Sequence, residues 1–164
     1  MDAYQAIISK RDTRTFTSEP VSDDSLRRVL QAGRMAGSAK NRQPVSFVVL
    51  RDRSRKEELA KCGDFSAWIP ETAVAIAVVM PEGEREFDAG RAAQNLMIAA
   101  NAEGLASCPA TMHHTECAAE VLGLPDGHRV HIVIGIGHGP TGHEEKRPDA
   151  ARKPFDDYVH HDRW

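Results

Sequence analysis

Residues 36–47 of the chain read AGSAKNRQPVSF, and the apolar run FVVL at 47–50 follows at once. The loop is rich in small residues, and Ser38, Asn41 and Gln43 add side chains that form hydrogen bonds. Between a helix and a buried strand, such a loop brings its backbone close to a flat ligand, while the amides supply donors and acceptors. We interpret the stretch as a cofactor cradle. The same residues are also typical of a plain helix exit, so composition alone leaves both interpretations open.

The chain of 164 residues has the length of one compact domain with its own core. Hydrophobic residues make up 41% and charged residues 27%, which is usual for a globular protein. The 21 basic and 24 acidic residues give a net charge of −3, so no nucleic-acid partner is expected. The longest apolar run, 73–80, is too short to cross a bilayer, and the first residues show no hydrophobic signal region. We therefore expect a cytoplasmic protein without a membrane partner.

Hydrophobic spacing predicts alternating helices and strands. Residues 72–80, TAVAIAVVM, predict a strand buried on both faces. Residues 22–36 predict a helix capped by Ser22, with an inward face of Leu26, Val29, Leu30, Gly33 and Met35. Further helices are expected at 2–9, at 54–62 with a polar cap at Ser54, at 88–103 before Gly104, and at 115–124 with a cap at Thr115 and a stop at Gly123. Further strands are expected at 47–50 and 129–137, with a short one within 105–112. The pattern indicates one α/β or α+β domain, a sheet layer covered by helices.

The three cysteines, Cys62, Cys108 and Cys117, are odd in number and lack CxxC spacing. A disulfide or a thiolate metal site is therefore not expected, and the thiols are interpreted as buried or incidental. The histidine pairs at 113–114 and 160–161 are adjacent in sequence, so their side chains point in different directions. No metal site is predicted from them.

The common nucleotide and hydrolase motifs GxGxxG after a strand, GxxxxGK[ST] and GxSxG are absent. The glycine-rich IGIGHGPTG at 134–142 opens no helix, so it lacks the helix N-terminus that holds a pyrophosphate. The remaining polar features are spread along the chain, and one anionic, planar ligand touched by all of them would explain each. They are the cations Lys10, Arg11 and Arg14, the loop 38–43, the stretch LASCPATM at 105–112, and Arg147, Arg152 and Lys153 in the tail.

Five stretches, in order along nearly the whole chain, resemble the FMN-dependent nitroreductase family. KRDTRTF with Pro20-Val21 is similar to the family's RRSxRxF...PV, and SAKNRQPVSFVVL is similar to its SxxNxQPWxFVVV. DAGRAAQNLMIAANAEGLASC resembles the central helix DxGxAxQNLxLAAxxxGLGSC, and EVLGLPDGHRVHIVIGIGHG resembles LGLPxxxxxxxxxxIGxP. The tail RKPFDDYVHHDRW is like the family's arginine-rich ending.

The resemblance implies an α+β fold with a central, mostly antiparallel sheet, and an intertwined homodimer with FMN sites at the interface. It implies one nitroreductase-like domain over 1–164. The composition of 138–164, rich in Gly, Pro and charge but ending in apolar residues, predicts an extended arm that packs on its own domain or on a second subunit. By the same resemblance, Lys10 and Arg11 hold the FMN phosphate side, and Arg14 lies near the N1/C2 carbonyl edge. Ser38, Asn41 and Gln43 contact the flavin, and Ser38 comes from the partner subunit. The Thr111 backbone N–H approaches N5, and Arg152 binds the phosphate.

The activity that the resemblance implies is reduction of nitroaromatic or quinone-like acceptors by NADH or NADPH, through flavin N5 in a ping-pong cycle. No side-chain nucleophile or general base is required. Flavin fragmentation, dehalogenation and a non-catalytic flavin-binding module stay open as alternatives. The chain departs from the family pattern at Asp12, where a small serine is common, and at Val45, where tryptophan is frequent. Asp12 is expected to pair with an arginine or with the ribityl hydroxyls.

Overall fold

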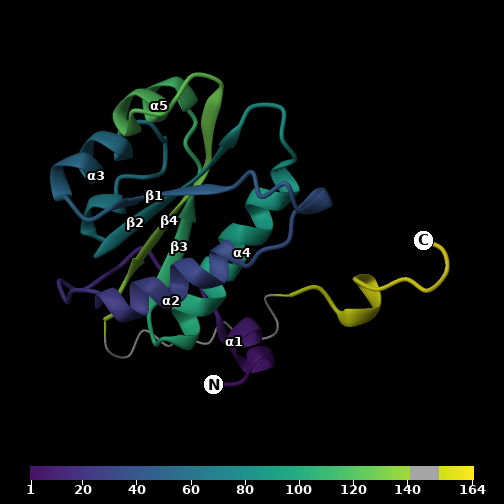
Figure 1. The fold of residues 1–164 in the computed structure, drawn as a ribbon. Coiled ribbons are helices and arrows are strands. Elements are labelled where there is room, and N and C mark those ends of the chain that lie inside the picture. The colour runs from purple at the N-terminus through teal and green to yellow at the C-terminus, as the bar shows by residue number, and fades with distance from the viewer. Residues whose placement is uncertain (141–151) are drawn as a thin grey trace.

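A four-stranded antiparallel sheet forms the centre of the computed structural model, which describes residues 1–140 and 152–164 (Figure 1). The strands are β1 (Ser46–Leu50), β2 (Val74–Pro81), β3 (Ala106–Ala110) and β4 (His128–Gly137), in the order β1-β2-β4-β3. Each neighbouring pair is antiparallel, so the expected α+β class with an antiparallel sheet is confirmed.

The side chains of β2 alternate between two hydrophobic clusters, one on each face of the sheet. Val74, Ile76 and Val78 pack with α2 (Asp23–Arg34) and α4 (Glu86–Ala102). Ala75, Ala77 and Val79 pack on the other face, which α3 (Arg53–Ala60) and α5 (Thr115–Leu122) cover. Successive residues of a strand point to opposite faces, so a strand at the centre of two clusters must be apolar throughout. The predicted strand buried on both faces is thereby confirmed.

Helix α2 begins as its sequence predicts, because the Ser22 Oγ accepts a hydrogen bond from the Ser25 N–H at 3.1 Å. Its buried face carries Gly33, where a Cβ atom would lie 2.6 Å from the Leu96 Cδ2. Glycine is therefore required for α2 to approach α4 this closely. The inward orientation expected for Met35 is wrong. Met35 is the C-terminal cap residue, and it is 66% exposed because the helix has ended.

The helix boundaries differ from the sequence expectations at two N-termini. Asp52, rather than Ser54, caps α3, because its carboxylate accepts the Arg55 N–H at 2.9 Å. The hydrogen bond from the Ser54 hydroxyl lowers the pKa of Asp52 most, and the hydrogen bond from the Arg55 N–H lowers it further. Thr115 does not cap α5, which follows His114 without a side-chain cap. The stops at Gly104 and Gly123 are confirmed by their left-handed φ angles of 75° and 62°.

A disulfide joins Cys62 to Cys117, so the expectation of free thiols is wrong for these two residues. They are 55 residues apart in sequence, but the end of α3 lies beside the first turn of α5, and their Cα atoms are 5.6 Å apart. Spacing along the chain carries no information about such a contact. Cys108 is free and buried, as expected.

The first element of the chain is helix α1 (Ala3–Ser9), which packs on the C-terminal half of α4 (Figure 1). The Asn101 side chain joins these two helices by donating to the Ala6 carbonyl at 3.0 Å. No helix within residues 1–140 and 152–164 has the length and apolar character needed to cross a membrane.

Candidate functional site

The segment that follows α1 runs along β3, which is an edge strand of the sheet. Asp12 forms a parallel bridge with Ser107, and the Thr13 N–H donates to the Ser107 carbonyl at 3.3 Å. This pairing fixes the backbone of the cationic segment 10–14 against the sheet. Three of the predicted site residues therefore lie on an ordered backbone.

Lys10 is the most enclosed cation of this segment, with only 11% of its side chain exposed. Its ammonium group forms an ion pair with Asp12 and lies 3.3 Å from the Met97 Sδ on α4. Asp12 thus pairs with a lysine rather than with an arginine. Because the carboxylate neutralises part of the local positive charge, an incoming phosphate would share Lys10 with Asp12.

The two arginines of the segment differ in their surroundings. The Arg11 guanidinium donates to the Ile8 carbonyl at 2.7 Å and to the Lys10 carbonyl at 2.8 Å, so it caps the end of α1. Arg14 is exposed and lies beside Cys108. Burial raises the pKa of the Cys108 thiol, and the interaction with Arg14 offsets only part of this effect. The thiol therefore stays protonated near neutral pH, which argues against a nucleophilic role.

The loop 38–43 is held by hydrogen bonds around a strained backbone. The Ser38 Oγ accepts the Gln43 N–H at 2.8 Å, and the Ala39 N–H donates to the buried Asp88 carboxylate of α4 at 3.4 Å. Three residues that are not glycine have left-handed backbones: Lys40 (φ 52°), Asn41 (φ 53°) and Gln43 (φ 51°). Each such residue costs about 1 to 3 kcal/mol, and strain of this kind clusters at ligand-binding loops. The backbone therefore favours the interpretation as a binding loop over that as a plain helix exit.

Thr111 follows β3 directly and is exposed. Its carbonyl packs against the backbone at Gly63, where a Cβ atom would come within 2.7 Å of the oxygen. Glycine at this position lets the segment after α3 lie against the segment after β3. The position of Thr111 consequently depends on the loop that begins at Cys62.

The cationic segment and the loop 38–43 contact different ends of α4. Lys10 contacts Met97, whereas the loop contacts Asp88, nine residues earlier, or about 13 Å along a helix. Within residues 1–140 and 152–164, no hydrogen bond or ion pair joins the two groups. One chain thus brings together Lys10, Arg11 and Arg14 at one place and Ser38, Asn41 and Gln43 at another.

The predicted tail residues are divided by the boundary of the described structure. Arg147 lies outside the described residues. Arg152 is described and exposed, and so are the aromatic residues beyond it, with Phe155 74%, Tyr158 78% and Trp164 99% exposed. These large apolar side chains are not covered by the described part of their own chain.

Sequence reasoning missed two polar residues. The Ser107 Oγ is buried next to Asp12 without a hydrogen-bond partner among the described residues, which marks a donor available to a ligand or a water molecule. Arg91 lies over the ring of Phe87, 5.7 Å from its centroid, beside a surface hollow of about 420 Å³. The four-residue spacing of Phe87 and Arg91, which places both on one face of α4, was the signal in the sequence for this contact. The hollow is lined by Met35, Ala36, Gly37, Phe87, Gly90, Arg91, Gln94 and Asn95.

The donor set fits FMN. The exposed Arg14 guanidinium and the Lys10 ammonium suit an anion, and the loop amides suit the polar edge of a flat ring. The unpartnered Ser107 hydroxyl adds a buried donor on the same edge of the sheet. Together, the helix-covered antiparallel sheet, its cationic edge and its strained amide loop define an α+β protein whose polar groups suit a planar anionic ligand.

Comparison with known proteins agrees with this class. The model of the nitroreductase family matches residues 7–85 and 79–138, and the chain belongs to this family. An Archaeoglobus fulgidus protein, whose name includes NAD(P)H nitroreductase, is 25% identical over 174 residues, covering 99% of both chains. The NADPH-flavin oxidoreductase of Vibrio harveyi is 28% identical over 183 residues, covering 99% of this chain and 75% of that protein.

A solved structure has the same fold. The NADPH:FMN oxidoreductase from Vibrio harveyi, complexed with NAD⁺, superposes with a TM-score of 0.87 at 25% identity. The match covers 99% of this chain and 77% of that chain. The predicted nitroreductase-like α+β fold is therefore confirmed.

Proposed function

We propose that this protein is an FMN-dependent NAD(P)H oxidoreductase that reduces nitroaromatic or quinone-like acceptors in a ping-pong cycle. The observation that carries the proposal is the cationic segment 10–14, which is fixed on the edge strand β3 by the pairing of Asp12 and Thr13 with Ser107. Family membership and the names of the relatives, which include NADPH-flavin oxidoreductase and NADPH:FMN oxidoreductase, support it. When bound, FMN supplies the chemistry, taking a hydride at N5 from the nicotinamide and passing it to the acceptor.

The residues of this chain bind and orient the cofactor. Lys10 and Arg11 are assigned to the phosphate side and Arg14 to the N1/C2 carbonyl edge. Ser38, Asn41 and Gln43 contact the ring, and Thr111 offers its backbone N–H near N5. Arg14 carries the electrostatic role, because a fixed guanidinium stabilises negative charge at the carbonyl edge. No side chain acts as a nucleophile or general base, in keeping with the buried, protonated Cys108.

A complete site needs two chains, and the protein is proposed to act as a homodimer. The two groups of site residues contact α4 at positions about 13 Å apart, and a second copy is proposed to complete the site by contributing Ser38. The exposed aromatic residues of the tail support the same assembly, because 138–164 is then an arm that packs on the partner subunit. The domain remains one unit, 1–164, with a small-molecule acceptor as its other partner and a cytoplasmic location.

The visible spectrum of the purified protein tests this function. We expect FMN, co-purified or added and then freed of excess by gel filtration, to give a protein-bound flavin band. Anaerobic addition of NADH or NADPH should bleach the band, and a nitroaromatic or quinone should restore it. A protein that stays colourless after incubation with FMN would contradict flavin binding. A stable band that neither nicotinamide bleaches would instead identify a binding module without this activity.

The tail arginine gives a more local test. Arg152→Ala is expected to weaken FMN binding by about 10- to 150-fold, because a hydrogen bond to a charged group is worth about 1.5 to 3 kcal/mol. Fluorescence titration with FMN measures the change. Arg163→Ala removes another exposed tail arginine and should leave the affinity near that of the wild type. Equal affinities for the wild type and Arg152→Ala would remove Arg152 from the site.

A further inference from the structure

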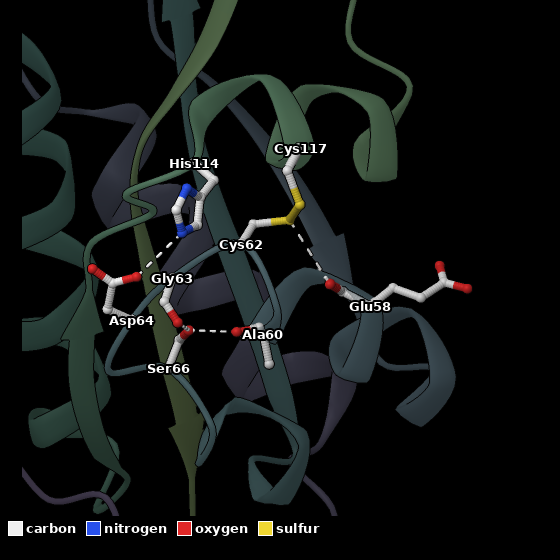
Figure 2. The surroundings of a disulfide bond; sticks show 8 residues. All are labelled: Glu58, Ala60, Cys62, Gly63, Asp64, Ser66, His114 and Cys117. Atoms are coloured by element: carbon white, nitrogen blue, oxygen red, sulfur yellow. Dashed lines mark hydrogen bonds and ion pairs between the residues drawn. A yellow bond between two sulfur atoms is a disulfide. The ribbon is translucent and has the colours of Figure 1, made fainter.

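The disulfide between Cys62 and Cys117 joins the loop after α3 to the first turn of α5 (Figure 2). Cys62 follows the end of α3, and Cys117 lies in the first turn of α5. The chain between β3 and α5 is only four residues long and contains Thr111. A covalent bond at the start of α5 therefore anchors the far end of the segment that begins at Thr111.

Polar contacts around the disulfide connect the same two segments. The His114 N–H donates to the Cys62 carbonyl at 2.9 Å, and the Asp64 N–H donates to the His113 Nδ1 at 3.1 Å. The His114 ring also lies 3.2 Å from the Asp64 carboxylate (Figure 2). These contacts are exposed, so each contributes little by itself. The disulfide adds a covalent link from the loop that begins at Cys62 to Cys117, three residues beyond the end of residues 111–114.

The two cysteine residues differ in exposure. Cys62 is fully buried, whereas Cys117 is half-buried. An incoming thiolate must reach the sulfur that it attacks, so the accessible position is Cys117 and the leaving group is Cys62. The third cysteine, Cys108, is buried on β3 and bonded to neither, so it does not compete for the exchange.

We propose that Cys62–Cys117 is a thiol–disulfide exchange site for dithiol reductants, and that its redox state controls how firmly residues 111–114 are held. A reductant thiolate attacks the Cys117 Sγ, the protein disulfide breaks, and Cys62 leaves and takes up a proton. The second thiol of the reductant then displaces Cys117, which takes up the other proton. Two electrons pass from the dithiol, which becomes a disulfide, to the cysteine pair, which becomes two thiols.

The consequence for the cofactor rests on the proposed function. With the disulfide formed, the Thr111 N–H is preorganised toward the flavin. With two thiols, the segment opens more often, and cofactor binding must first restore its order. Reduction is thus expected to lower FMN affinity without removing any residue that contacts FMN.

Alkylation and amide exchange test the site itself. Folded protein treated with dithiothreitol, then alkylated in denaturant, should carry three labels by mass spectrometry, against one without reductant. Reduction should also speed hydrogen exchange of the His114 amide, which donates to the Cys62 carbonyl, by about tenfold or more, because the restraint on local opening is lost. A single label after reductant treatment of the folded protein overturns the exchange site. Unchanged amide exchange in protein that carries three labels overturns the control of 111–114.

Cofactor titration separates this inference from the proposed function. The oxidised wild type should bind FMN about tenfold or more tightly than the reduced form, since ordering the segment adds to the cost of binding. Cys117→Ser should resemble the reduced form with or without dithiothreitol, whereas the neighbouring Glu116→Gln should still respond. If FMN binds equally in both redox states, the coupling is refuted and the flavin function stands. If neither state binds FMN, the flavin function fails, and alkylation and amide exchange still decide the exchange site.

Discussion

Replacing Arg14 by alanine is expected to slow reduction of the bound flavin by about 100- to 1000-fold. A well-placed donor to developing negative charge is worth about 2.7 to 4 kcal/mol in a preorganised site. Arg14 is suited to this role because the pairing of Asp12 and Thr13 with Ser107 fixes its backbone, while its side chain is exposed. Stopped-flow measurement of the flavin band after mixing with NADH or NADPH gives the rate.

Arg55 provides a matched control for this experiment. It is an exposed arginine on α3 that pairs with Glu58 and has no assigned role in the site, so Arg55→Ala should leave the rate of flavin reduction near that of the wild type. Arg14→Lys keeps the charge without the planar fork and should fall between the wild type and Arg14→Ala. If Arg14→Ala binds FMN and is reduced at the wild-type rate, Arg14 has no electrostatic role in the reaction.

Leu96→Ala is expected to lower the free energy of unfolding by about 3 to 5 kcal/mol, the range for truncating a buried leucine. Leu96 has no exposed surface. Its side chain projects from α4 onto the Gly33 backbone of α2, next to the Phe47 ring. The sheet and the two helices enclose this space from several sides, so we expect the cavity to relax only partly. Guanidinium chloride unfolding, with the disulfide kept oxidised, measures the change.

Ile7→Ala serves as the comparison for Leu96→Ala. It removes an aliphatic side chain from α1 that is 53% exposed, so its effect should stay within about 1 kcal/mol. A similar loss for both variants would show that Leu96 does not occupy a tightly packed position.

The elements that could be predicted from sequence were those with local physical causes. The apolar run at 72–80 is buried on both sides only when helices cover both faces of the sheet. Ser22 caps α2 through a hydrogen bond to Ser25, three residues later. Ser54 was the wrong choice of cap because Asp52, two residues earlier, offers a carboxylate to the same turn. Local rules therefore located the helix but not its first residue.

The parts of the site that could not be predicted depend on contacts between distant segments. The disulfide requires α3 to lie beside α5, and the capping role of Arg11 requires its side chain to turn back toward Ile8. The pairing of Asp12 with Lys10 places opposite charges within one extended segment, and the sequence shows only that both residues are present. Which residues are near one another is set by packing, and a single sequence does not state it.

The separation of the cationic segment from the loop 38–43 along α4 has a genetic consequence. If each site takes Arg14 from one subunit and Ser38 from the other, a chain without Arg14 and a chain without Ser38 damage opposite halves of a site. In a mixed pair of these chains, both lesions fall in one site and the other site is intact. Two inactive alleles of this gene would then restore activity when expressed in the same cell.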